Sequence, residues 1–204
     1  MNIYLVRHGK DEEGYRGGWS RLGLVEEGII QSRKLGQYLR EHEQSYGIRT
    51  FIASDLPRAM QTANEIGQKL AIPPVYTEEW REMNNGDLAG MPNTEAEAQY
   101  PGVYFNTLRM DTPFPGGETP AHFQARIIRA FDRLCAKIES GEIESNLLLV
   151  THGGVINVLY YHLSGEEWTN QSAFHSIEQT SIHTVTKTAE GWRITARNAT
   201  PHLG

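Results

Sequence analysis

The chain has 204 residues, of which 39% are hydrophobic and 22% charged, and its formal net charge is −6 at pH 7. This length suits one domain with a substantial hydrophobic core. The acidic balance and the lack of a basic run argue against binding to nucleic acid or to an anionic membrane, so an anionic ligand would need a local cluster of cations.

No segment of the chain has the pattern of a signal peptide or a membrane span. The N-terminus opens directly into a short apolar run, and no window approaches a continuous apolar stretch of membrane-spanning length. The single cysteine, Cys135, excludes an intramolecular disulfide and lies on the apolar side of a helical pattern, which indicates a buried thiol. We therefore expect a cytoplasmic protein, either a monomer or a homodimer.

Strand and helix patterns alternate along the first part of the chain. The predicted elements are a strand over 3–6, an amphipathic helix over 26–43, a strand over 50–53, a helix over 57–70 and a short strand over 74–77. Pro57 suits the first turn of its helix, and Ser54 and Asp55 offer side chains that can cap it.

From Glu78 to Thr119, prolines and glycines interrupt the pattern, which predicts an insertion at about 78–119 with one or two short helices, covering one side of a site. The remaining elements are a helix over 120–139, a strand starting at Leu147, a helix after Gly154, and strands around 181–187 and 192–197. This order predicts a single α/β domain over 1–204. Its architecture would be a three-layer α/β/α sandwich whose mostly parallel sheet has an antiparallel end.

Two of the predicted strands end in a histidine followed by glycine. Arg7-His8-Gly9 follows the first strand, and Thr151-His152-Gly153-Gly154 follows the Leu147 strand. In an open parallel sheet, ligands bind outside the carboxyl ends of the strands. His8 and His152 are therefore expected to lie on opposite sides of one site.

This set of side chains suits the transfer of a phosphoryl group, which needs positioned cations, a nucleophile and an acid for the leaving group. Arg7 and Arg58 could grip the phosphoryl oxygens with bidentate hydrogen bonds. His8 could attack through one ring nitrogen while the other donates to a backbone carbonyl. His152 would be a charged or donating partner, and the helix that starts at Gly153 would add backbone N–H groups.

The missing carboxyl group is expected from Glu82, which an irregular loop could hold over the site to protonate the leaving oxygen and then activate water. A second chemistry for the two histidines is a metal site completed by Glu82 or Asp55. The neighbouring arginines would repel a dication, which disfavours this alternative. A further alternative is an inactive module that uses the anion pocket to bind a phosphorylated partner.

Four motifs in this order resemble the histidine phosphatase superfamily, the phosphoglycerate-mutase-like enzymes. They are Leu5-Val6-Arg7-His8-Gly9, Ser54-Asp55-Leu56-Pro57-Arg58, Glu82 with Gly86 and Gly90, and Thr151-His152-Gly153-Gly154. The resemblance implies that His8 becomes a phosphohistidine, that Arg7, Arg58 and His152 hold the phosphoryl group, and that Glu82 is the acid and base. It implies no metal and no cofactor, and it places Asn85 among the residues that line the substrate pocket.

Two departures from the family pattern bear on the substrate. The loop from Lys10 to Trp19 is atypical, and Gly154 stands where true mutases carry asparagine. Between Asn84 and Pro120 the only cation is Arg109, whereas mutases carry a longer insertion rich in arginine and lysine. The two differences from the mutases favour a phosphatase that acts on a small phosphorylated metabolite and releases inorganic phosphate. The nearest resemblance is to broad-specificity bacterial phosphatases and α-ribazole phosphatases, and the alternative is a phosphoglycerate-mutase-type phosphotransferase.

Three further positions have a structural and a functional interpretation. Lys10 and Arg16 would be solvated loop residues or would meet an anionic leaving group, with solvation favoured. Glu118 would cap the following helix or steady an arginine, and a structural role is favoured.

Overall fold

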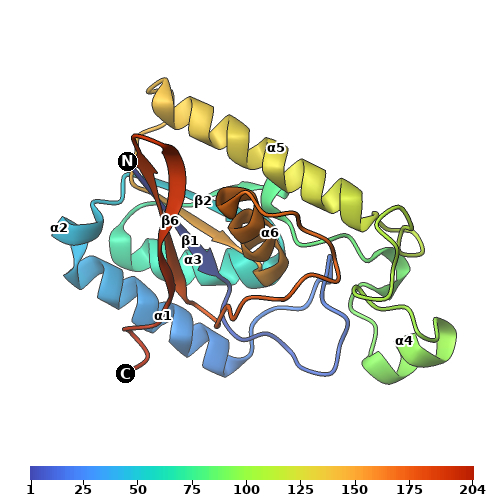
Figure 1. Ribbon diagram of the computed structural model, residues 1–204. Helices are drawn as coiled ribbons and strands as arrows, with labels where there is room; N and C mark the ends of the chain where they lie inside the picture. The colour runs from blue at the N-terminus through green and yellow to red at the C-terminus, as the bar shows by residue number, and fades with distance from the viewer.

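A computed structural model describes residues 1–204 and contains one six-stranded sheet with helices on both faces (Figure 1). The strands lie in the order β3-β2-β4-β1-β5-β6, and the first four run parallel to one another. Strand β5 pairs antiparallel with both β1 and β6. The predicted three-layer sandwich, with a mostly parallel sheet and an antiparallel end, is confirmed.

The strands are β1 (Asn2–Arg7), β2 (Thr50–Ser54), β3 (Val75–Thr77), β4 (Leu147–Thr151), β5 (Ile182–Thr188) and β6 (Gly191–Ala199). The helices are α1 (Glu26–Glu41), α2 (Glu43–Tyr46), α3 (Pro57–Leu70), α4 (Asn93–Gln99), α5 (Pro120–Glu139) and α6 (Gly153–Ser164), with 3₁₀ helices η1 (Glu78–Trp80) and η2 (Gly86–Leu88). None of these helices is both long and apolar enough to cross a bilayer.

One predicted boundary differs at the end of the first helix. Helix α1 ends at Glu41, and the four-residue helix α2 follows, whereas the sequence predicted one helix to residue 43. No residue of α2 is buried, so the sequence carries no apolar periodicity that could have indicated a separate helix there.

Side chains of the central strands alternate between two hydrophobic cores. Ile3 and Leu5 of β1 pack in the core that contains residues of α5 and α6. Tyr4 and Val6 pack in the other core, with residues of α1 and α3. Because helices cover both faces of the sheet, the central strands are continuous apolar runs without polar alternation.

The start of α3 corrects one expectation about helix capping. Its N-cap residue is Leu56, and no side chain caps the helix. Asp55 instead accepts two hydrogen bonds from Arg81, at 2.6 and 2.5 Å. The predicted capping role of Asp55 is therefore wrong, because a bidentate pair with a guanidinium is stronger than a neutral cap.

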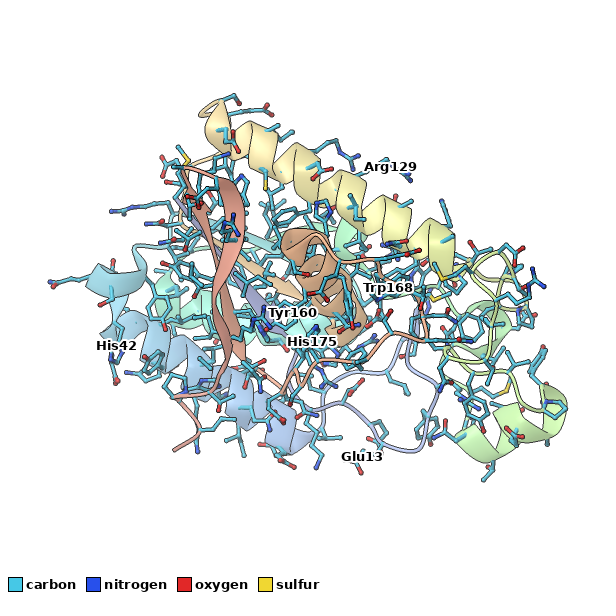
Figure 2. The ribbon with its side chains drawn as sticks, in the orientation of Figure 1. Glu13, His42, Arg129, Tyr160, Trp168 and His175 are labelled. Carbon is cyan, nitrogen blue, oxygen red and sulfur yellow. The ribbon has the colours of Figure 1, made fainter.

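A buried histidine joins β5 to α6 and β6. His183 is fully buried, its Nδ1 lies 2.5 Å from the Tyr160 hydroxyl, and its Nε2 lies 2.8 Å from the Ser181 hydroxyl. Tyr160 also packs edge-on against His175, with ring centroids 4.8 Å apart (Figure 2). Burial lowers the pKa of His183 to about 4.

We predict that His183 makes the fold sensitive to acid. Below about pH 6.5 the unfolded chain binds a proton at this position, whereas the folded chain binds it only near pH 4, so the free energy of unfolding falls as the pH drops through this window. The contribution of His183 to the free energy of unfolding falls by about 3 kcal/mol between pH 6.5 and pH 4. Urea unfolding at several pH values measures it. His183→Gln should be less stable near neutral pH but should show a flatter pH dependence, and an unchanged slope would contradict the assignment.

Candidate active site

The pairing of β1 with β4 brings the two strand–histidine units together. Arg7 lies opposite Thr151 in the parallel register, and the backbone N–H of His8 donates to the Thr151 carbonyl at 2.9 Å. The rings of His8 and His152 have centroids 5.2 Å apart. Helix α3 begins after β2 and α6 begins after β4, so two helix N-termini, which favour an anion, lie at the same edge of the sheet.

His8 is held as a neutral imidazole with a defined tautomer. Its Nδ1 lies 2.7 Å from the Gly9 carbonyl, which can only accept, so Nδ1 carries the proton. Its Nε2 is then unprotonated, and the lone pair of this nitrogen accepts a hydrogen bond from Arg58 Nε at 3.2 Å. Burial lowers the pKa of His8 well below its usual value, and the charges of Arg58 and Arg7 lower it further. The sequence predicted the direction from the arginines, but burial is the larger cause.

Arg58 is a buried guanidinium that connects His8 to the first loop. It is 2% exposed, and it donates to the Gly18 carbonyl at 2.8 Å and to the Ser20 hydroxyl at 3.3 Å. Asp11 lies 3.5 Å from its Nε. Burial lowers the pKa of Arg58, and the carboxylates of Asp11 and Glu82 oppose this shift.

Arg7 and His152 each keep a buried nitrogen that has no hydrogen-bond partner in the protein. Arg7 donates from Nη1 to the Ile177 carbonyl at 2.6 Å, but its Nε is unpaired. His152 Nε2 lies 2.8 Å from the Ser54 hydroxyl, and its Nδ1 is unpaired. Burial, followed by the charge of Arg58, lowers the pKa of His152 well below its usual value, which favours the donating role over the charged one.

Glu82 is fixed against the N-terminus of α6. Its Oε2 accepts from the backbone N–H of Gly154 at 2.9 Å, and its Oε1 accepts from that of Met83 at 3.0 Å. Its backbone carbonyl accepts from Trp19 Nε1 and from Arg126 Nη2, both at 2.7 Å. A β-carbon at Gly154 would lie 2.3 Å from Glu82 Oε1, so this position of the carboxylate requires glycine there.

Glu118 and Arg126 support the segment that carries Glu82. The Glu118 carboxylate accepts from Arg126 at 2.8 and 3.1 Å and from the backbone N–H of Asn84 at 2.7 Å. The N-terminus of α5 is capped instead by Thr119, whose hydroxyl accepts from the His122 N–H. Glu118 therefore steadies an arginine, Arg126, and does not cap the following helix.

A cavity of about 380 Å³ joins these groups. Every predicted site residue lines it except His152, which is fully buried. Asn85 is among the lining residues, and its Oδ1 accepts from the backbone N–H of Trp19 at 3.1 Å. The lining residues that the sequence did not reveal include Asp11, Tyr104, Phe105, Phe114 and Phe174. They come from irregular segments, where no periodic pattern marks an inward-facing side chain.

The two cations of the first loop have different surroundings. Lys10 donates to Glu27 at 2.9 Å and does not line the cavity, in agreement with its interpretation as a solvated residue. Arg16 does line the cavity, and its guanidinium lies 4.1 Å from the centroid of the Tyr104 ring. The favoured interpretation of Arg16 as a solvated loop residue is therefore wrong, because Tyr104 from a distant segment covers it.

The alternative metal site lacks a suitable ligand set. No group of three or more His, Cys, Asp or Glu side chains is arranged to hold a metal ion. Asp55, one of the two carboxylates considered for it, is occupied by Arg81.

Comparisons with known proteins identify the family of the chain and agree with its fold. Residues 3–200 match the family model described as histidine phosphatase superfamily (branch 1), and the chain belongs to this superfamily. The family and the enzyme class predicted from the sequence, a histidine phosphatase, are confirmed.

Two curated relatives represent both activities within the family. The chain is 28% identical over 204 residues to the uncharacterized phosphatase PhoE of Bacillus subtilis, covering 98% of this chain and 96% of that protein. It is 27% identical over 172 residues to a 2,3-bisphosphoglycerate-dependent phosphoglycerate mutase of Methylobacterium radiotolerans, covering 80% of this chain and 79% of the mutase.

Two solved structures share the fold. The α-ribazole phosphatase of Shigella flexneri has a TM-score of 0.80 at 23% identity, and the match covers 98% of this chain and 97% of that one. A mycobacterial glucosyl-3-phosphoglycerate phosphatase in complex with inorganic phosphate has a TM-score of 0.77 at 23% identity, covering 100% and 99% of the two chains.

We predict that His8 keeps the same tautomer and stays neutral over the working pH range. Nitrogen NMR of the folded protein should find Nδ1 protonated and Nε2 unprotonated, with no titration between about pH 8 and pH 6, because burial and two arginines disfavour the imidazolium. The same residue in urea should titrate near 6.5, the value of an unperturbed histidine. A folded-state titration close to the urea value would contradict the burial argument.

Proposed function

We propose that the protein is a metal-independent phosphatase that hydrolyses phosphate monoesters of small metabolites through a phosphohistidine on His8. The supporting observation is a nucleophilic nitrogen in the cavity lining, with two buried nitrogens that have no hydrogen-bond partner close to it. Arg7 Nε and His152 Nδ1 are buried and unpaired beside a histidine whose Nε2 lone pair is free of a proton. Unpaired buried polar nitrogens are costly, and phosphoryl oxygens would accept from Arg7 Nε and from His152 Nδ1 in the tautomer that protonates it.

In the first half of the proposed reaction, His8 Nε2 attacks phosphorus and the ester P–O bond breaks. The imidazole keeps its Nδ1 proton, and the hydrogen bond to the Gly9 carbonyl stabilises the positive charge that develops on the ring. Arg7, Arg58 and His152 hold the phosphoryl oxygens, with the N-terminal amides of α6 at Gly153. Glu82 gives its proton to the leaving oxygen, and the alcohol departs.

In the second half, water attacks the phosphorus and the N–P bond breaks. Glu82, now ionised, takes the proton from the water, and inorganic phosphate leaves. His8 returns to its neutral form. The relative that was solved with inorganic phosphate supports this anion as the product. We further propose that residues 1–204 form one domain in which the insertion at 78–119 covers the site.

Release of phosphate to water is favoured over the mutase-type transfer that some relatives perform. Arg109, the only cation between Asn84 and Pro120, is 83% exposed and pairs with Asp111 at 3.2 Å. It does not line the cavity. Beyond the phosphoryl-binding residues, Arg16 is the one cation in the cavity lining. A single cation is a poor binding site for a second phosphate group.

Replacing the nucleophile tests the covalent route. His8→Ala should lose on the order of 10⁴-fold or more of kcat, because no other group at that position can form the intermediate. Rapid quench of the wild type should trap acid-labile phosphate on His8. His42→Ala, which removes an exposed histidine stacked on Tyr38, is the matched control and should retain full turnover. Turnover of His8→Ala above about a tenth of wild type is incompatible with the proposal.

Replacing the acid tests the role of Glu82. Glu82→Gln should slow the phosphorylation of His8 by alkyl esters roughly 10²–10⁴-fold, because alkoxide leaving groups need a proton. Aryl esters with good leaving groups should be slowed much less in this step. Glu79→Gln, which changes an exposed carboxylate paired with Arg133, serves as the control and should behave as the wild type. Equal small effects on alkyl and aryl esters would assign the acid to another group.

A further inference from the structure

The cavity continues beyond the phosphoryl-binding residues into a part with an apolar lining. Met83, Leu88, Phe105 and Phe114 contribute to this lining and are joined by Arg16 and Tyr104. We call these six residues the leaving-group wall. In the proposed reaction the phosphoryl group lies at His8, so the rest of the substrate extends along the remaining lining of the same cavity.

Arg16 is the polar side chain of this wall whose hydrogen-bonding capacity is unused. Its side chain is 15% exposed, and its Nε is buried without an acceptor. The nearest carboxylate oxygen belongs to Glu97 and lies 4.0 Å away, beyond hydrogen-bond reach. That carboxylate already accepts from the Tyr104 hydroxyl at 2.6 Å and from the Gly102 N–H at 3.3 Å.

Other arginines of the chain form hydrogen-bonded ion pairs with carboxylates. Arg81 pairs with Asp55 and Arg126 pairs with Glu118, each through two nitrogens. Arg16 has only the long ion pair to Glu97, and a largely buried guanidinium without a hydrogen-bonded acceptor is unfavourable unless a ligand supplies one.

The backbone holds Arg16 in this position. Its N–H donates to the Met91 carbonyl at 2.9 Å, and its carbonyl accepts from the Gly90 N–H at 2.8 Å. The neighbouring Phe105 is also fixed, because Asn170 donates to its carbonyl at 2.6 Å and Trp168 packs on its ring. The wall is therefore a preformed surface.

Resting on the proposed phosphatase reaction, we infer that Arg16, stacked on Tyr104, binds a carboxylate on the leaving group of the substrate. A planar guanidinium matches a carboxylate with two parallel hydrogen bonds. A single guanidinium suits one such group. The apolar side chains that line the same cavity would contact an apolar body. The substrate class is thus the phosphate ester of an apolar alcohol, aromatic or aliphatic, that carries a carboxyl group.

Matched benzyl phosphates test this inference, because their alcohols are similarly poor leaving groups. Phosphate release is measured for benzyl phosphate, its meta- and para-carboxy derivatives and the corresponding carboxamides. At least one carboxylated ester should have a kcat/KM about tenfold or more above that of benzyl phosphate, mainly through KM. The kcat/KM of the carboxamides should fall between the values for benzyl phosphate and the carboxylated ester, because a carboxamide accepts hydrogen bonds but carries no charge.

Variants then locate the preference. Arg16→Met should lower kcat/KM for the preferred carboxylated ester about tenfold or more and that for benzyl phosphate by a much smaller factor. Arg16→Lys should recover part of the preference, because it restores the charge but not the planar fork. Arg109→Met, which removes an exposed cation outside the cavity, is the control and should keep the wild-type preference.

The outcomes separate this inference from the proposed function. Failure to hydrolyse any of the esters, benzyl phosphate included, would reject the phosphatase itself. Hydrolysis of all esters without a preference for a carboxylate would reject the role of Arg16 and leave the phosphatase intact. Equal losses for charged and uncharged esters in Arg16→Met would mean that Arg16 only supports the first loop, which also overturns the inference.

Discussion

The parallel pairing between β1 and β4 sets the separation of the two histidines on which the site depends. Arg7 is level with Thr151 in this register, and the N–H of His8 continues the ladder to the Thr151 carbonyl. A slip by one residue would turn each side chain of β1 to the other face of the sheet, so the two buried cores that enclose the strands also fix the register. The position of the histidines is thus secured by hydrophobic packing some distance from the chemistry.

Burial gives the site its electrostatic character. His8, Arg58 and His152 are each less than a twentieth exposed, and the pKa of each is lowered because the charged form is poorly solvated there. Arg58 keeps its charge with the help of Asp11 and of the Gly18 carbonyl. Neither histidine pairs with a carboxylate, and both stay neutral. A buried cation beside a neutral imidazole favours the binding of an anion. The imidazole itself keeps an unprotonated nitrogen, which can act as the nucleophile.

The succession of strands and helices along the chain and the strand–histidine units could be predicted because both follow from local patterns: apolar runs of strand length, and a basic residue with glycine where each run ends. Arg58 could be placed because its helix starts at the end of a neighbouring strand. Arg126 could not, since its contact with the Glu82 segment depends on how α5 is rotated against that segment. Tyr104 and Phe174 lie in irregular stretches, where no period tells an inward side chain from an outward one. The pairing of Asp55 with Arg81 was missed for a similar reason, because the two residues are distant in sequence.

Arg58 donates hydrogen bonds to Gly18 and Ser20, so the first loop competes with a bound anion for the donors of this guanidinium. An anion that recruits these donors must take them from the loop, so anion affinity and loop order are thermodynamically linked and each changes the other by the same factor. Loosening residues 17–20 would strengthen the binding of phosphate, and tightening them would weaken it. Because Trp19 in this loop also holds the carbonyl of Glu82, the linkage extends to the acid. Changes in the loop sequence can therefore tune product release without altering any group that touches phosphorus.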